Sequence, residues 1–301
     1  MTSPTETLLA RAEQFLTPSL LWVMPEPAAG LRNIPGLRAT HSFRPEVLAL
    51  QRMGIKADAG WPAGDSSTIA LTLPRQAEWA FGLLARALEH LPPGGVLLAT
   101  ARNDRGGKRY VSALEEHFGS LWADSKNHCR MIAVERPAAL PPVVAAWKGS
   151  YVPETVEGTD MLALPGTFSC EHIDKGSALL AAQLPVLSGH IADFGAGWGY
   201  LSRHLLANSP GISRLDLYEA DANALATATS NLKAFENKVQ FFWRDLLSEP
   251  VPQNYDAIVM NPPFHDLQDP DPSIGRGVVA AAANALKAGG QLWVVANRHL
   301  A

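Results

Sequence analysis

Several features that narrow a protein's function are scarce or missing in this sequence. Only two cysteines occur among 301 residues, Cys129 and Cys170, which rules out a disulfide framework or a cysteine-based zinc motif. The nine histidines show no paired spacing, so we expect no metal site. The sequence contains no signal peptide and no apolar run of membrane length, and the expected compartment is therefore the cytoplasm.

An excess of positive charge is also missing. The chain has 25 Lys and Arg residues against 29 Asp and Glu residues, a formal net charge of −4. This balance argues against a nonspecific nucleic-acid binder coated with positive charge, although local patches can still bind RNA. It suits a selective enzyme that acts on an assembled, folded substrate.

The most informative motif that is present is Asn261-Pro262-Pro263-Phe264, which directly follows the apolar run 257–260. Such a run predicts a buried strand, and open α/β sheets bind ligands where their strands end. The Asn261 side-chain carbonyl and a backbone carbonyl presented outward at Pro262 offer two acceptors for a planar NH2 group, and Phe264 offers a stacking surface for a base. The alternative is an Asn-Pro turn that only closes the strand.

A glycine-rich segment follows another short apolar strand, predicted at 191–194, and precedes a predicted helix at 201–207. It carries Asp193, Gly195, Gly197 and Gly199. Glycines allow close backbone approach to a ligand, and the helix N-terminus supplies free N–H groups. The spacing differs from the dinucleotide fingerprint, and Asp193 suits an ammonium better than a pyrophosphate. S-adenosylmethionine therefore fits this segment better than NAD.

Two further acidic residues stand where predicted strands end. Glu219 closes the strand predicted at 215–219 and is placed to accept the hydroxyls of a ribose, whereas Asp245 follows the strand predicted at 239–243 and could accept from an adenine amine. Either acid could instead be a helix cap. Asp216 is expected to be only a solvated or edge residue.

These motifs, in this order, carry a resemblance to a known family. Residues from about 164 to 301 resemble class I S-adenosylmethionine-dependent methyltransferases, and within them the branch that methylates guanine N2 in ribosomal RNA. Phe168-Ser169 followed by Asp174-Lys175-Gly176-Ser177 is similar to the segment that precedes the cofactor strand in the ribosomal guanine enzymes. The alternative for that segment is an N-capped surface helix.

The resemblance implies S-adenosylmethionine as cofactor and a role for each matching residue. It implies a catalytic role for Asn261, Pro262 and Phe264, with Phe264 contacting the substrate base. It implies cofactor contacts for Asp193, Gly195, Gly197, Gly199, Glu219, Asp245 and Asn261.

The N-terminal half resembles a degenerate repeat of the C-terminal half. Residues 68–74 parallel 256–262, and 91–99 parallel 286–294, a repeat too long to dismiss as chance. Pro25-Glu26-Pro27 stands where glycines are needed, and Leu73 replaces the catalytic Asn. We therefore expect a degenerate domain that binds no cofactor, similar to the non-catalytic N-terminal domain of the same ribosomal RNA enzymes.

The N-terminal half contains one clear basic cluster, formed by Arg102, Arg105, Lys108 and Arg109. Closely spaced cations of this kind are candidates for phosphate contacts in a bound RNA. The alternative is a solvated loop around Gly106-Gly107.

The expected fold is α/β, with two tandem Rossmann-like class I methyltransferase domains. We expect a degenerate domain at 1–137, a proline-marked linker at 138–146 and a catalytic domain at 147–301. The chain ends soon after the strand predicted at 291–296, whereas the N-terminal copy continues to another strand. The catalytic domain is therefore expected to lack its last strands, as in a truncated form.

The predicted function is methylation of the exocyclic N2 amine of a guanine in ribosomal RNA. The expected partner is 16S rRNA within an assembled or partly assembled small subunit, with no membrane and no metal. Three alternatives stay open: a large-subunit guanine, a glutamine side-chain amide in a release factor, and a non-catalytic RNA-binding or assembly protein. Enzymes of the glutamine type usually carry Tyr where this chain has Phe264.

Overall fold

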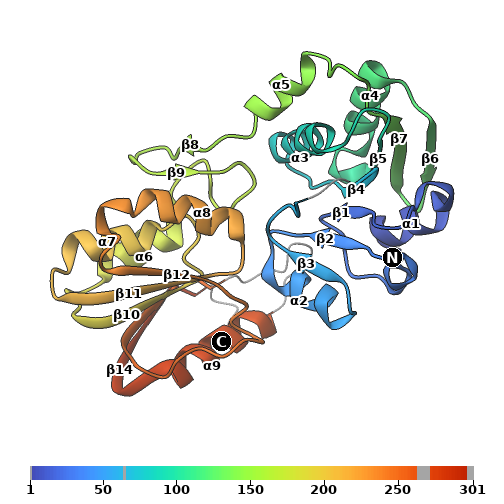
Figure 1. Ribbon diagram of the computed structural model, residues 1–301. Coiled ribbons are helices and arrows are strands. Elements are labelled where there is room, and N and C mark those ends of the chain that lie inside the picture. Colours follow the sequence, from blue (N-terminus) through green and yellow to red (C-terminus); the bar gives the residue numbers. More distant parts are fainter. Residues whose placement is uncertain (1, 64–65, 263–271, 297–301) are drawn as a thin grey trace. The chain divides into compact units, whose positions relative to one another are not determined.

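The computed structural model describes residues 2–63, 66–262 and 272–296. The chain divides into two compact units, Met1–Val152 and Pro153–Ala301, each with a sheet of its own (Figure 1). Among the described helices, none is long and apolar enough to cross a membrane.

The first unit contains a seven-stranded sheet in the order β3-β2-β1-β4-β5-β7-β6. Strands β1 to β5 pair in parallel, whereas β7 is antiparallel to both β5 and β6. The strands are β1 (Leu21–Val23), β2 (Arg38–Thr40), β3 (Lys56–Asp58), β4 (Thr68–Thr72), β5 (Val96–Arg102), β6 (Trp122–Lys126) and β7 (Cys129–Glu135). The helices are α1 (Pro4–Arg11), α2 (Arg44–Arg52), α3 (Ala77–His90), α4 (Gly107–Phe118) and α5 (Val143–Gly149).

Helices cover both faces of this sheet, which explains its continuous apolar strands. All five residues of β4 are buried, as is usual for a central parallel strand with helices on either side. One core cluster centres on α3 and Leu84, and a second centres on Leu8 of α1 and Trp22 of β1. The first unit therefore has a hydrophobic core of its own on each face of its sheet.

The division between the units comes later in the chain than the sequence predicted. Residues 143–149 form helix α5, whereas the sequence predicted a linker at 138–146 and the start of the catalytic domain at 147. Trp147 of α5 is 8% exposed and stacks on Phe81 of α3 with ring centroids 5.1 Å apart. This helix belongs to the first unit because its large aromatic side chain completes that unit's core.

The second unit contains a five-stranded parallel sheet in the order β12-β11-β10-β13-β14. Its strands are β10 (Gly189–Phe194), β11 (Ile212–Glu219), β12 (Val239–Trp243), β13 (Tyr255–Met260) and β14 (Leu286–Val294), and a small hairpin pairs β8 (Glu154–Thr155) with β9 (Leu162–Ala163). The helices are α6 (Lys175–Gln183), α7 (Tyr200–Asn208), α8 (Ala222–Asn231) and α9 (Pro272–Ala285). This strand order repeats that of the first five strands of the first unit, which confirms the predicted tandem architecture.

The structure contradicts the prediction for Asp216. The side chain is 1% exposed on β11, a strand with neighbours on both sides. Its carboxylate accepts hydrogen bonds from Arg214 Nε at 2.6 Å and the Tyr255 hydroxyl at 2.8 Å, and it lies 3.0 Å from His190 Nε2. These partners satisfy the hydrogen-bonding capacity of the buried carboxylate. The local sequence around Asp216 did not predict that this residue is buried.

Candidate active site

Two of the predicted motifs meet at the centre of the second sheet. Strands β10 and β13 are neighbours, and Phe194 pairs with Met260 as the last residue of each strand. The glycine segment and Asn261 therefore leave the sheet side by side, and a Cβ added to Gly195 would lie 3.7 Å from the backbone oxygen of Asn261. The sheet order reverses here, because β11 and β13 flank β10, and open α/β sheets bind ligands at such a point.

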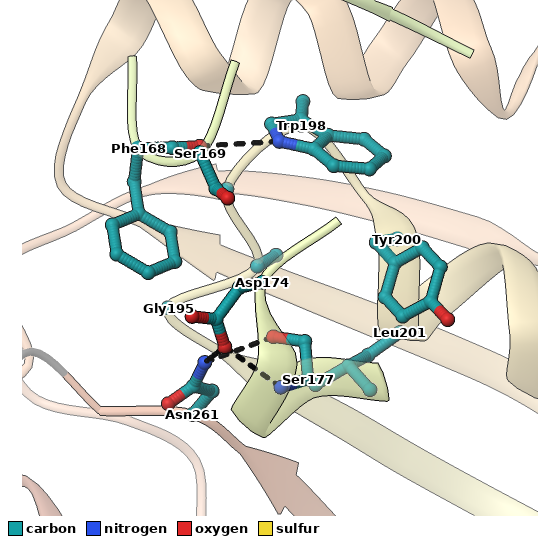
Figure 2. Close-up of a pocket in the computed structure, with 11 residues that line it drawn as sticks. Phe168, Ser169, Asp174, Ser177, Gly195, Trp198, Tyr200, Leu201 and Asn261 are labelled. Atoms are coloured by element: carbon teal, nitrogen blue, oxygen red, sulfur yellow. Dashed lines mark hydrogen bonds between the residues drawn. The ribbon is translucent and has the colours of Figure 1, made fainter. Parts of the chain in front are cut away.

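A pocket opens at this edge of the sheet, lined by both motifs and by the segment that precedes helix α6 (Figure 2). The residues that line it are Phe168, Ser169, Asp174, Ser177, Gly195, Ala196, Gly197, Trp198, Tyr200, Leu201 and Asn261.

The glycine loop needs its glycines because of the backbone conformation that they adopt. Gly195, Gly197 and Gly199 have φ values of 73°, 54° and 93°, a region that residues with a Cβ rarely adopt. Gly199 is also the N-cap of helix α7, and a Cβ there would make only ordinary contacts, 3.4 Å from side-chain atoms of Ala228 and Leu232. The loop can therefore turn tightly while its backbone stays accessible from the pocket.

Asp193 is a buried acid with an unused hydrogen-bonding oxygen. Its Oδ2 accepts from the Ser202 hydroxyl at 2.7 Å, whereas its Oδ1 has no partner among the described residues. Burial raises the pKa of Asp193 to about 6 because the charged form loses hydration. An orphaned carboxylate oxygen directly before the glycine loop fits an ammonium or a bridging water as its missing donor.

Glu219 holds the glycine loop from the neighbouring strand. Its Oε2 accepts the backbone N–H of Gly197 and its Oε1 accepts the backbone N–H of Asp221, both at 2.8 Å. Burial raises the pKa of Glu219 to about 7, although these two N–H groups lower it. Each oxygen has a second lone pair for a ribose hydroxyl, and that role stays a prediction.

Asp245 is engaged in its own turn. Its Oδ1 accepts the backbone N–H of Leu247 at 3.0 Å, and its Oδ2 accepts from the Ser248 hydroxyl. Residues 246–248 form a turn and not a helix, so these contacts close a turn, and the alternative of a helix cap is wrong for Asp245. A contact with adenine stays a prediction.

Asn261 is held by the segment that the sequence placed before the cofactor strand. Its side-chain nitrogen Nδ2 donates to Asp174 Oδ2 and to Ser177 Oγ, both at 2.8 Å (Figure 2). Asp174 is also the N-cap of helix α6, so the predicted alternative of an N-capped helix is correct, and this cap contacts the motif that is predicted to be catalytic. Pro262 is buried. Phe264 lies outside the described residues.

Three residues that support the pocket were not singled out from the sequence. Trp198 Nε1 donates to the backbone oxygen of Phe168 at 3.1 Å, which fixes the rim of the pocket. Asn231 of α8 donates to the backbone oxygens of Leu162 and Trp198, both at 2.8 Å. Ser202 supports Asp193. Such contacts join distant segments, and no local pattern marks them.

The corresponding edge of the first unit has a different content. Helix α1 lies there, and the Thr5 hydroxyl is 3.2 Å from the Thr72 hydroxyl at the end of β4. In the loop after β1, the backbone N–H of Glu26 donates to Thr5 Oγ1 at 2.9 Å. Both Thr5 and the neighbouring Thr7 are fully buried. The chain's own helix thus packs where the second unit has its pocket.

The basic cluster spans the end of β5 and the start of α4. Arg102 pairs with Asp104 at 2.9 Å and its side chain is 19% exposed, whereas Lys108 and Arg109 are exposed and Arg105 is half-buried. A phosphate contact by this cluster stays a prediction, and Arg102 is its least available member. Within the described ranges, no group of three or more His, Cys, Asp or Glu side chains is arranged to hold a metal ion.

Comparison with known proteins agrees with this geometry. The methyltransferase small domain family matches residues 158–301. A ribosomal RNA small subunit methyltransferase C from Shewanella pealeana is 34% identical over 236 residues, which are 77% of this chain and 69% of that protein. The protein of the same name from Shewanella oneidensis is 32% identical over 237 residues, 78% of this chain and 69% of that protein.

A solved structure shares the fold over both units. The T. thermophilus 16S rRNA N2 G1207 methyltransferase, in complex with AdoMet and guanosine, matches with a TM-score of 0.78 and 24% identity. The match covers 99% of this chain and 84% of that one. On the identity and coverage of its curated relatives, this chain belongs to the ribosomal RNA small subunit methyltransferase C family.

Proposed function

We propose that this protein transfers the methyl group of S-adenosylmethionine to the exocyclic N2 amine of a guanine in 16S ribosomal RNA. The observation that carries the proposal is the meeting of the glycine loop and Asn261 at the adjacent ends of β10 and β13. The relatives named above support the substrate class, and the name of the T. thermophilus enzyme specifies G1207. The corresponding guanine is the proposed target here.

The residues around the glycine loop fit S-adenosylmethionine. The orphaned Oδ1 of Asp193 is matched to the ammonium of the cofactor, directly or through a water. Glu219, which also accepts the backbone N–H of Gly197, is proposed to accept the ribose hydroxyls. Asp245, which also accepts the backbone N–H of Leu247, is proposed to contact the adenine. The cofactor supplies a methyl group on a sulfonium, which is already a good leaving group, so the protein's task is to bind, orient and exclude water.

Asn261 is proposed to orient the guanine amine toward the methyl group. Its side-chain oxygen and the backbone oxygen of Pro262 are proposed to accept the two hydrogens of the guanine amine. Two such acceptors favour a pyramidal nitrogen whose lone pair points at the methyl group, and the amine proton then leaves to solvent. The base has to be splayed out of its helix to reach this pocket, and Phe264 is proposed to stack on it.

The first unit is proposed to recognise the substrate without binding a cofactor. Its exposed cations Lys108 and Arg109 are candidate contacts for RNA phosphates. A chain with net charge −4 relies on few such contacts, which favours a small subunit that is at least partly assembled as the substrate. Because the proposed substrate is a ribosomal subunit, the proposed compartment is the cytoplasm.

A transfer assay tests the proposal. The protein and labelled S-adenosylmethionine are incubated with one substrate in each reaction. The substrates are small subunits, naked 16S rRNA, large subunits and a release factor. Label in small-subunit RNA alone is the expected result. Label in the release factor would support glutamine methylation instead, and cofactor binding without any transfer would support a non-catalytic RNA-binding role.

A further inference from the structure

The orientation of the Asn261 amide is set by two partners on one side. Nδ2 donates one hydrogen to Asp174 Oδ2 and the other to Ser177 Oγ, and each bond is 2.8 Å long. No described residue donates a hydrogen bond to Asn261 Oδ1. Figure 2 shows the nitrogen turned toward Asp174 and the oxygen on the opposite side of the amide.

The chemistry of Asp174 makes this orientation one-sided. The two ends of an asparagine amide are nearly identical in shape, so packing alone does not choose between them. An ionised carboxylate only accepts hydrogen bonds, and it therefore selects Nδ2 over Oδ1. A flipped amide would bring Oδ1 against the carboxylate and present an NH2 group to the guanine amine, where two donors would face each other.

Asp174 is itself fixed in place by helix α6. Its Oδ2 also accepts the backbone N–H of Ser177 at 2.8 Å, so one oxygen serves both the helix and Asn261. A Cβ added to Gly176 would lie 3.0 Å from this oxygen, closer than most real contacts, and the glycine leaves the oxygen room. The orientation of the Asn261 amide therefore depends on the N-terminus of helix α6.

We propose that Asp174, together with Ser177, is a positioning residue that turns the Asn261 oxygen toward the substrate amine. This inference rests on the proposed function, because only a donor-rich substrate group needs that oxygen. Asp174 acts through Asn261, and its loss affects turnover far more than cofactor affinity.

Three substitutions separate this role from a structural one. Asp174→Ser keeps a good N-cap for α6, but its hydroxyl ends one bond short of the Asn261 nitrogen. Ser177→Ala removes the second acceptor and leaves the helix intact. Asn261→Ala removes the group that is positioned. Each variant and each pair with Asn261→Ala is assayed for kcat, for KM of the RNA, for S-adenosylmethionine affinity and for thermal unfolding.

The expected result is a loss of kcat that is not additive. Asp174→Ser should lower kcat roughly tenfold or more, with cofactor affinity and melting temperature nearly unchanged. In the Asn261→Ala background, the same substitution should change kcat by less than about threefold, since nothing is left to position. Equal losses in both backgrounds would overturn the proposal and leave Asp174 as a helix cap.

A measurement without turnover distinguishes failure of this inference from failure of the proposed function. The side-chain amide signal of Asn261 in a ¹⁵N-labelled protein is identified by its disappearance in Asn261→Ala. We expect it to shift in both Asp174→Ser and Ser177→Ala. An unchanged signal would refute the positioning role even in an active enzyme, whereas a wild-type protein that methylates no guanine would refute the proposed function.

Discussion

Asp193 accepts a hydrogen bond of 2.7 Å from Ser202, which ties the end of strand β10 to the first turns of helix α7. The bond occupies one carboxylate oxygen and leaves the other, buried, with no partner in the described part of the chain. A buried acid with half of its acceptors unused destabilises a fold unless something fills the place. The arrangement is what a binding site for a cationic group requires.

Asp193→Asn should therefore weaken cofactor binding while leaving the free protein at least as stable. The raised pKa of about 6 means that ionised Asp193 lowers the stability of the free protein above that pH, and the neutral amide removes this penalty. We expect S-adenosylmethionine affinity to fall by about 1–3 kcal/mol, measured by calorimetry, with no fall in melting temperature at pH 8. Asp256→Asn is the control, because Asp256 lies near the start of β13, at the opposite edge of the sheet from the candidate site. This variant should bind S-adenosylmethionine with the affinity of the wild type.

Cofactor affinity should increase as pH rises toward neutrality. Burial holds the pKa of Glu219 at about 7 and that of Asp193 at about 6 in the free protein, and hydroxyl or ammonium donors favour the ionised forms. Binding therefore releases protons, and affinity should rise from about pH 5 and level off above about pH 7. Glu219→Gln should remove the part of this rise that lies nearest pH 7. A flat profile for the wild type would contradict the assigned roles.

Asn261→Ala should reduce turnover far more than cofactor affinity. Asn261 offers an acceptor that matters most when the amine becomes pyramidal, so its loss raises the barrier by about 2–4 kcal/mol. Single-turnover kinetics with saturating RNA, together with a cofactor titration, make the comparison. Equal losses in the two quantities would move Asn261 to a cofactor-binding role.

The basic cluster is tested by its salt dependence. Replacement of Arg102, Arg105, Lys108 and Arg109 by Ser should weaken RNA binding and flatten the plot of log affinity against log salt. The slope should change by roughly 0.7–0.9 for each phosphate contact removed. Arg102→Ser alone should change it least because Arg102 is paired with Asp104. Unchanged binding in the fourfold variant would show that the cluster is a solvated loop.

The sequence predicted the parts of this fold that local patterns encode. The apolar strand before Asn261 and the strand before the glycines were both recognisable because parallel strands are buried on both faces. The repeat between the halves then predicted two sheets of one type. Helix α5 was missed because its proline-rich surroundings suggested a linker, and the contact of Trp147 with Phe81 is a tertiary effect.

The candidate site was predictable only in part, for the same reason. The glycine loop and Asn261 follow parallel strands and Glu219 ends one, so their meeting at one sheet edge was predictable from the topology. The bond between Asp174 and Asn261 joins segments far apart in the sequence, and nothing local indicates it. Asp216 was misjudged because two of its partners, His190 and Tyr255, lie on other strands.

Nucleoside mass analysis of small-subunit RNA, after reaction with the protein and S-adenosylmethionine, shows directly whether the protein methylates guanine N2. Wild-type protein should produce N2-methylguanosine at one position, and Asn261→Ala should produce little or none in the same time. A methyl group on any other atom or base, or the same yield from Asn261→Ala, would contradict the account.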